Sequence, residues 1–223
     1  MQQRKSRIFI IYFLLLILLG SIHNIGVNKV KLANISKINI LGLGIDNNDL
    51  IMERINNLEL GNIFFIKKKK LQRIIDQNTL VEKYDIFKVY PSSLYINIQK
   101  TNFLARMNYN GVNFIIGSNG KFSNNELYQK ELPYIFGSPK IDEFLHFKKI
   151  IEVSKLEYKD IKNFYYYASG RWDIEFINEI IVKLPVKDID NAIQLVFEFL
   201  DRSDLQQIKI IDARIKNQII IND

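Results

Sequence analysis

Residues 89–98 read VYPSSLYINI, and this stretch decides how the first folded unit is built. Leu94, Ile96 and Ile98 alternate with less apolar neighbours at period two, which is typical of a half-buried strand. Pro91 and the serines after it turn the chain back from an earlier alternating run. The stretch therefore predicts two consecutive strands joined by a turn.

Working outward towards the N-terminus, residues 38–41 predict a short strand that is followed by two helices. Asp46 or Asn47 can cap the first helix, and Gly61 can end it. The second helix begins in the lysine run 67–70, which is interpreted as a solvated first turn, with contact to anionic lipid headgroups as the alternative. The segment thus predicts a compact unit with the order strand, helix, helix, strand, strand.

The rest of the chain predicts a mainly antiparallel β domain with two helices. Asn110-Gly111 and Asn119-Gly120 are typical hairpin turns between alternating apolar residues. One helix is expected over residues 140–152, and Ala192, Leu195, Val196 and Phe199 place a second at helical spacing. We find no rhythm of strand, helix and parallel strand in this part. The predicted fold class is therefore α+β.

An unbroken apolar run, Ile8–Leu19, follows several basic residues near the N-terminus. A membrane-spanning helix needs about 20 residues, so we expect a single transmembrane helix over residues 8–27 after a cytoplasmic tail at 1–7. A cleavable signal peptide is the alternative, although Leu18 and Leu19 make a poor cleavage site. The basic tail predicts a cytoplasmic N-terminus, with everything after the anchor outside the cytoplasm.

Composition narrows the classes of chemistry that this chain can perform. Among 223 residues there are no cysteines and two histidines, which excludes disulfides, thiolate metal sites and cysteine nucleophiles. The net charge of +7 arises from 31 Lys+Arg against 24 Asp+Glu. That excess of positive charge accompanies an Ile-, Asn- and Lys-rich composition typical of A+T-rich codons. No motif typical of nucleic-acid-binding proteins is present, so the charge does not predict a nucleic-acid-binding surface. No residue pattern sets a nucleophile beside a base, so we expect no enzyme activity, cofactor or metal, and no nucleic-acid partner.

The last residues form the most informative segment. Residues 218–222 read QIIIN and predict an apolar, β-branched terminal strand without charge or proline. A strand at the edge of a sheet can template a strand of another protein, and charges or prolines usually protect such edges. The pattern favours strand addition by a partner. The alternative is a strand packed between two neighbours inside the sheet.

The order of these segments resembles the FtsQ/DivIB family of bacterial cell-division proteins. The likeness covers nearly the whole chain, and each motif is short. In the near-terminal motif, Ala213 stands where the family usually has leucine. The segments that carry the resemblance are residues 38–42, 61–66, 89–98, 132–137, 171–174, 181–185 and 211–214. The resemblance implies a POTRA domain over residues 34–100 and an FtsQ-type β domain over residues 101–223.

The resemblance also implies a function. The chain would be a non-catalytic bitopic scaffold of the divisome that links early and late division proteins and influences septal peptidoglycan synthesis. It would lie in the inner membrane at the division septum, with the C-terminal domains in the periplasm. Its partners would be FtsB and FtsL, other divisome membrane proteins, and the bilayer through residues 8–27.

In this family the terminal strand accepts a strand of FtsB, and an arginine matching Arg214 meets acidic residues of that partner. A second arginine lies beside the tryptophan of a neighbouring strand, and Arg171 matches it. Arginine suits this role because its planar fork holds a carboxylate with two hydrogen bonds. The implied partner-binding residues are Arg171, Arg214, Ile215, Lys216, Asn217, Gln218, Ile219, Ile220 and Ile221.

A second function fits the same segments. POTRA-containing periplasmic chaperones and transport components also bind extended polypeptides by strand addition. Many of them feed a membrane barrel, whose strands of about 10 residues alternate lipid-facing and inward-facing positions. The chain has one POTRA-like unit and no such series of strands, so the scaffold is the preferred prediction.

Overall fold

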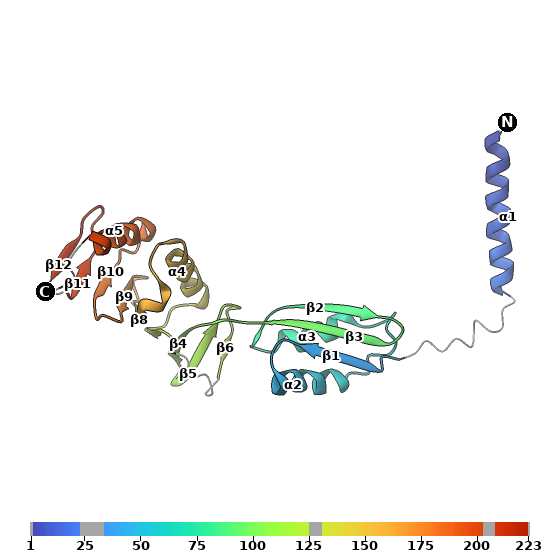
Figure 1. Ribbon diagram of the computed structural model, residues 1–223, viewed down its shortest axis with the longest axis horizontal. Helices are drawn as coiled ribbons and strands as arrows, with labels where there is room; N and C mark the ends of the chain where they lie inside the picture. Colours follow the sequence, from blue (N-terminus) through green and yellow to red (C-terminus); the bar gives the residue numbers. More distant parts are fainter. Residues whose placement is uncertain (1, 23–33, 125–130, 203–207, 223) are drawn as a thin grey trace.

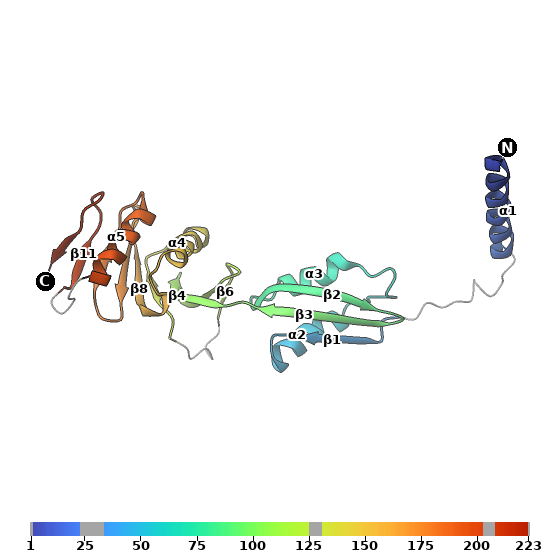
Figure 2. The same cartoon turned by 45° about the horizontal axis from the view of Figure 1, so that its top comes forward.

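The computed structural model describes residues 2–22, 34–124, 131–202 and 208–222 (Figure 1). Within these residues the chain has a mixed α/β fold of five α-helices, a short 3-10 helix and twelve strands. Figures 1 and 2 show two folded units end to end, where β3 leads into β4. The helices are α1 (Gln2–Ile22), α2 (Ile45–Asn56), α3 (Lys68–Asp76), α4 (Ile141–Val153), α5 (Ile189–Arg202) and the 3-10 helix η2 (Tyr158–Asp160).

The first unit is a three-stranded sheet with two helices packed on it. Its strands are β1 (Lys37–Leu41), β2 (Val81–Val89) and β3 (Ser93–Lys100), in the order β1-β3-β2. β3 pairs in parallel with β1 and antiparallel with β2. The apolar alternation of β3 puts Leu94, Ile96 and Ile98 in one core with α2 and α3. The lysines at the start of α3 are exposed.

The second unit is built on one nine-stranded sheet. Its order is β12-β11-β10-β9-β8-β7-β4-β5-β6. The strands are β4 (Phe103–Tyr109), β5 (Val112–Gly117), β6 (Phe122–Ser123), β7 (Tyr134–Phe136), β8 (Ile161–Tyr166), β9 (Trp172–Phe176), β10 (Ile181–Lys183), β11 (Ile210–Asp212) and β12 (Ile220–Asn222). Trp172 is buried and stacks on Phe147 of α4, with ring centroids 4.6 Å apart.

The predicted α+β class is wrong, because this sheet is mixed: among the described residues, five of its eight strand pairings are antiparallel and three are parallel. α4 connects β7 to the parallel strand β8, and α5 connects β10 to the parallel strand β11. β4 and β7 are parallel as well. The strands β7, β10 and β11 have three residues each. So short a strand offers too few positions for a periodic pattern, and the parallel crossovers therefore escaped the sequence analysis.

The structure contains an arrangement that repeats within the second unit. β7, α4, β8 and β9 form a parallel crossover followed by an antiparallel strand. β10, α5, β11 and β12 repeat that order and those pairings. Since β9 and β10 join the two halves side by side, β12 occupies in the second half the position that β9 occupies in the first.

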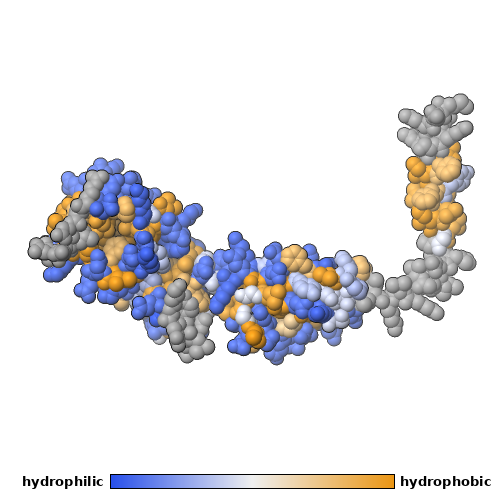
Figure 3. Space-filling view, viewed as in Figure 1, coloured by the Kyte–Doolittle hydropathy of each residue, from blue (hydrophilic) through white to orange (hydrophobic). Residues whose placement is uncertain are grey.

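The described residues do not support the predicted transmembrane helix over residues 8–27. Among the described residues, no helix has both the length and the apolar character that crossing a membrane requires. α1 ends at Ile22, and residues 23–27 of the expected anchor lie outside the described residues, as do residues 1 and 223. The side chains of the apolar run Ile8–Leu19 are exposed along α1 (Figure 3).

Candidate functional site

The edge of the large sheet at β12 is the candidate site. β12 pairs with β11 on one side, and no described strand pairs with it on the other. Ile220 and Ile221 keep 52% and 48% of their surface exposed, although both are large and apolar. Backbone N–H and C=O groups at such an edge lack a protein partner and can pair with an added strand.

The sequence analysis placed the terminal strand over residues 218–222, and the structure shortens it. β12 begins at Ile220, while Ile219 packs in part against the core. The backbone N–H of Gln218 donates to the carbonyl of Ile215 at 3.1 Å, which closes a turn. Asn217 has a φ of 59°, a left-handed conformation that asparagine tolerates well. Ile215 and Lys216 are exposed on this turn, so the residues predicted to bind a partner are divided between a turn and a short strand.

Arg214 lies at the start of that turn and is held by Asp212 of β11. Its Nε donates to Oδ1 of Asp212 at 2.8 Å, and its Nη2 donates to Oδ2 at 2.5 Å. The Arg214 hydrogen bond is the main reason that the pKa of the Asp212 carboxyl lies below its ordinary value. Lys183 of β10 lowers that pKa further through its charge, while partial burial opposes the shift. The guanidinium group of Arg214 is thus held in one orientation by Asp212, and the Arg214 side chain remains partly exposed to solvent.

Arg171 is held in a similar way at the start of β9. Its Nε and Nη2 donate to the two carboxylate oxygens of Asp173 at 3.1 and 3.2 Å. Its guanidinium also lies 4.0 Å above the centre of the Tyr167 ring, a favourable cation–π contact. Asp173 is only 1% exposed, so the ion pair offsets the cost of burying its carboxylate.

The sheet brings the two arginines together although they are far apart in sequence. Asp173, Lys183, Asp212 and Ile220 lie opposite one another across β9, β10, β11 and β12, and so share one face of the sheet. Asp173 and Tyr167, which hold Arg171, also help to raise the pKa of the Arg214 guanidinium, after the larger effect of Asp212. The charged row, which consists of Asp173, Lys183 and Asp212, ends at Ile220 of the apolar edge strand β12.

The sequence predicts a role for Arg171 and Arg214, which the aspartates of this row hold. It does not indicate a role for Asp173, Lys183 or Asp212. The signal for Asp173 was the alternation of residues 172–176, which places its side chain on the face opposite to that of Trp172. The roles of Lys183 and Asp212 depend on the pairing of β10 with β11, for which no sequence signal was present. Within the parts of the chain that the structure describes, no three His, Cys, Asp or Glu side chains come together to hold a metal ion.

Comparison of the chain with models of known protein families and with curated proteins finds no match. The proposed function is therefore based on the geometry of the β12 edge and its charged row.

Proposed function

We propose that the chain binds a partner protein by strand addition at the outer edge of β12. The observation that supports this proposal is the exposure of an apolar edge strand that carries no charge and no proline. An added strand would pair with the backbone of β12 and cover Ile220 and Ile221. Burying apolar area contributes roughly 25 cal/mol per Å², and the backbone hydrogen bonds add to it.

The internal repeat supports a particular orientation of the partner strand. β9 has its outer side covered by β10, which runs antiparallel to it. β12 stands in the equivalent position and has no described strand in the place of β10. A partner strand that runs antiparallel to β12 would extend the sheet with the pairing already used between its two halves.

The charged row supports an acidic partner segment. Arg214 and Arg171 are held by aspartates on the same face of the sheet, Arg214 just after β11, the neighbour of the edge strand, and Arg171 beside β9, three strands from the edge. Each is oriented by an aspartate, so little side-chain entropy is lost when a carboxylate of the partner approaches. We therefore infer that carboxylates follow or precede the partner's strand.

These features fit the FtsQ/DivIB-type role that the sequence resemblance implies. In this proposal the chain is a non-catalytic scaffold of the divisome, its first unit acts as a POTRA domain, and the β12 edge holds the FtsB–FtsL pair. The chain would act at the periplasmic face of the inner membrane at the septum, and it would influence septal peptidoglycan synthesis through that pair.

The alternative, a chaperone for extended polypeptides, would use the edge strand β2 of the first unit. β2 is longer, with nine residues, but its sequence contains charged residues throughout. Charged side chains protect edge strands against pairing. β12 lacks this protection, which favours a dedicated partner at β12. The charged residues of β2 are Glu82, Lys83, Asp85 and Lys88.

The test is the affinity for the soluble part of the FtsB–FtsL complex from the same organism. A stop after Asn217 removes β12, and we expect a loss of affinity of about a hundredfold or more, because the backbone pairing is gone. Arg214→Glu should weaken binding about tenfold, because a charge-assisted hydrogen bond is lost. Ile45→Glu, at an exposed position of α2 in the first unit, is the matched control.

Trp172 fluorescence and circular dichroism would establish that each variant is folded. Equal affinity of the parent chain and the chain without β12 would contradict the proposal. In cells, a fluorescent fusion of the parent chain should gather at midcell, and a uniform distribution would contradict the divisome role while leaving strand addition to be judged by the binding data.

A further inference from the structure

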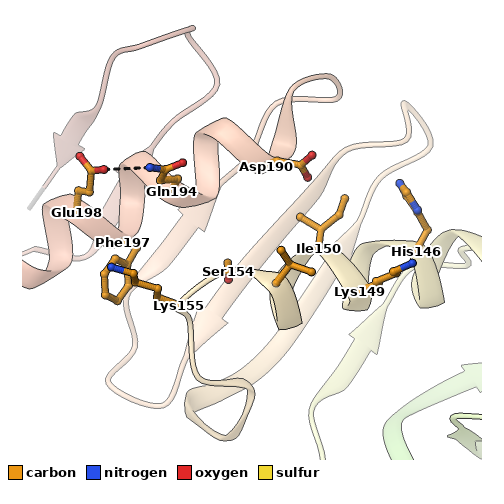
Figure 4. A pocket seen from close by; sticks show the side chains of 10 residues that line it. His146, Lys149, Ile150, Ser154, Lys155, Asp190, Gln194, Phe197 and Glu198 are labelled. Atoms are coloured by element: carbon orange, nitrogen blue, oxygen red, sulfur yellow. Dashed lines mark hydrogen bonds between the residues drawn. The ribbon is translucent and has the colours of Figure 1, made fainter.

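A groove of about 550 Å³ separates α4 from α5 on the side of these helices that is turned away from the sheet (Figure 4). Its lining residues lie three or four positions apart on each helix, so each set forms one helical face. Different faces of α4 and α5 cover the sheet, through residues such as Phe147 and Val196. The groove is lined by His146, Lys149, Ile150, Val153, Ser154 and Lys155 from α4 and the residues after it, and by Asp190, Gln194, Phe197 and Glu198 from α5.

The apolar part of the lining includes one side chain that is mostly exposed. Val153 keeps 82% of its surface exposed at the end of α4. Ile150 of α4 and Phe197 of α5 are partly exposed and also line the groove (Figure 4). A second hollow of about 500 Å³ continues past Phe197 and includes Ile177, which is 61% exposed. The two hollows share Phe197 and Lys155. The residues Ile150, Val153, Phe197 and Ile177 of the two hollows are called the apolar strip.

The two walls of the groove carry opposite charges. Lys149 and Lys155 stand on the α4 side, and Lys155 lies 5.3 Å above the ring of Phe197. Asp190 and Glu198 stand on the α5 side. An occupant that carries an acidic flank and a basic flank on the two sides of an apolar stripe would therefore be complementary to this groove.

The kind of backbone that can occupy the groove follows from its walls. Both walls are helices, whose interior N–H and C=O groups bond within the helix, so they offer side chains rather than backbone partners. An extended segment would leave its own N–H and C=O groups unpaired against the apolar strip, at a cost of about 1–3 kcal/mol for each buried group. A helix satisfies its own backbone and can pack its ridges between those of α4 and α5.

We propose that the groove between α4 and α5 binds an amphipathic helix of a partner protein. Its apolar residues, at spacing i, i+3 or i+4, and i+7, lie over Ile150, Val153 and Phe197. Its acidic flank faces Lys149 and its basic flank faces Asp190. This surface lies on the helical layer of the second unit, whereas the β12 site is a sheet edge. Binding at one site can therefore be tested independently of binding at the other.

The experiment uses three fluorescent synthetic peptides of about 14 residues, roughly 20 Å as helices. All three carry the same leucine stripe; one has an acidic and a basic flank, one has two acidic flanks, and one has two basic flanks. We expect the mixed-flank peptide to bind the parent chain about tenfold more tightly than either other peptide. Replacing both lysines of the α4 wall, Lys149→Glu together with Lys155→Glu, should reverse this order in favour of the peptide with two basic flanks, because both walls are then acidic.

Val153→Glu places a charge on the apolar strip at a position too exposed to disturb folding, and it should weaken binding of the mixed-flank peptide about tenfold. Ile45→Glu is the matched control, because Ile45 is 80% exposed at the start of α2. The absence of binding by all three peptides, equal binding by all three, or equal effects of Val153→Glu and Ile45→Glu would overturn the proposal. Binding of FtsB–FtsL by the Val153→Glu variant should equal that of the parent chain.

Discussion

At the scale of single residues, the site depends on how Asp212 holds Arg214. The pKa of Asp212 is lowered from its ordinary value of 3.8 in the folded chain, chiefly by the Arg214 hydrogen bond. A carboxyl whose pKa falls on folding stabilises the folded state above the unfolded pKa, and this contribution is lost as the pH falls through the folded value. The stabilisation by Asp212 is therefore complete at neutral pH and is lost progressively as the pH falls below about 4.

We predict that Asp212→Asn lowers the melting temperature at pH 7 by about 2 °C, a modest effect because the pair is partly exposed. The difference from the parent chain should shrink progressively as the pH falls below 4. Melting curves at pH 7, 5, 3 and 2 would measure it. Asp85→Asn, at an exposed position of β2, is the control, and a difference that does not change with pH would contradict the prediction.

The sequence could indicate which residues matter here, but not how they are placed. Arg171 and Arg214 were named because their motifs resemble those of a family. Their aspartate partners lie only two residues away, yet a carboxylate two positions from an arginine is common in any sequence. The convergence of the two arginines requires the pairing of three strands, β9, β10 and β11, and no local pattern encodes that pairing.

At the scale of elements, the helices were predictable and the strand directions were not. Apolar spacing indicated both α4 and α5, because helices of thirteen and fourteen residues show several turns of the pattern. The parallel pairing of β10 with β11 depends on a crossover through α5, which is a property of the assembled sheet. The terminal edge strand was anticipated, although it is shorter than the sequence suggested.

The junction of β1 with β3 gives an element-scale prediction. Gly42 follows β1 with a φ of 122°, and a Cβ there would lie 1.7 Å from the carbonyl oxygen of Ile98. Gly42→Ala must therefore push the end of β1 away from β3, and we predict a loss of about 3 kcal/mol or more from the first unit. Gly44→Ala should cost less, because Gly44 has a positive φ of 92° but no atom close to its Cβ position.

The single tryptophan makes this prediction measurable unit by unit. Trp172 lies in the core of the second unit, so its fluorescence reports that unit, while far-ultraviolet circular dichroism reports both. In a urea titration, Gly42→Ala should lower the urea concentration at which the first unit unfolds. The dichroism curve should therefore shift far more than the fluorescence curve, which reports the second unit. Equal shifts for Gly42→Ala and Gly44→Ala would contradict the steric argument.

At the scale of the whole molecule, a polar network joins the two units. Oε2 of Glu82 on β2 accepts hydrogen bonds from the hydroxyls of Thr101 and Ser118 at 2.9 and 2.8 Å. Nδ2 of Asn119 donates to the carbonyls of Thr79 and Val81, both at 2.9 Å. The turn after β5 is thus bonded to the β2 side of the first unit.

We predict that combining Glu82→Ala with Asn119→Ala loosens this junction while both units remain folded, because each removed hydrogen bond contributes about 1 kcal/mol. The absence of cysteine allows donor and acceptor dyes to be placed on Cys residues introduced at two exposed positions, Asn57→Cys on the first unit and Ile177→Cys on the second. Single-molecule energy transfer should then show a broader distribution in the double variant. Asn108→Ala breaks a hydrogen bond to Asn113 within the second unit and should leave the distribution narrow. If the double variant is as narrow as this control, the network does not fix the relative orientation of the units, and the covalent connection through β3 and β4 must do so.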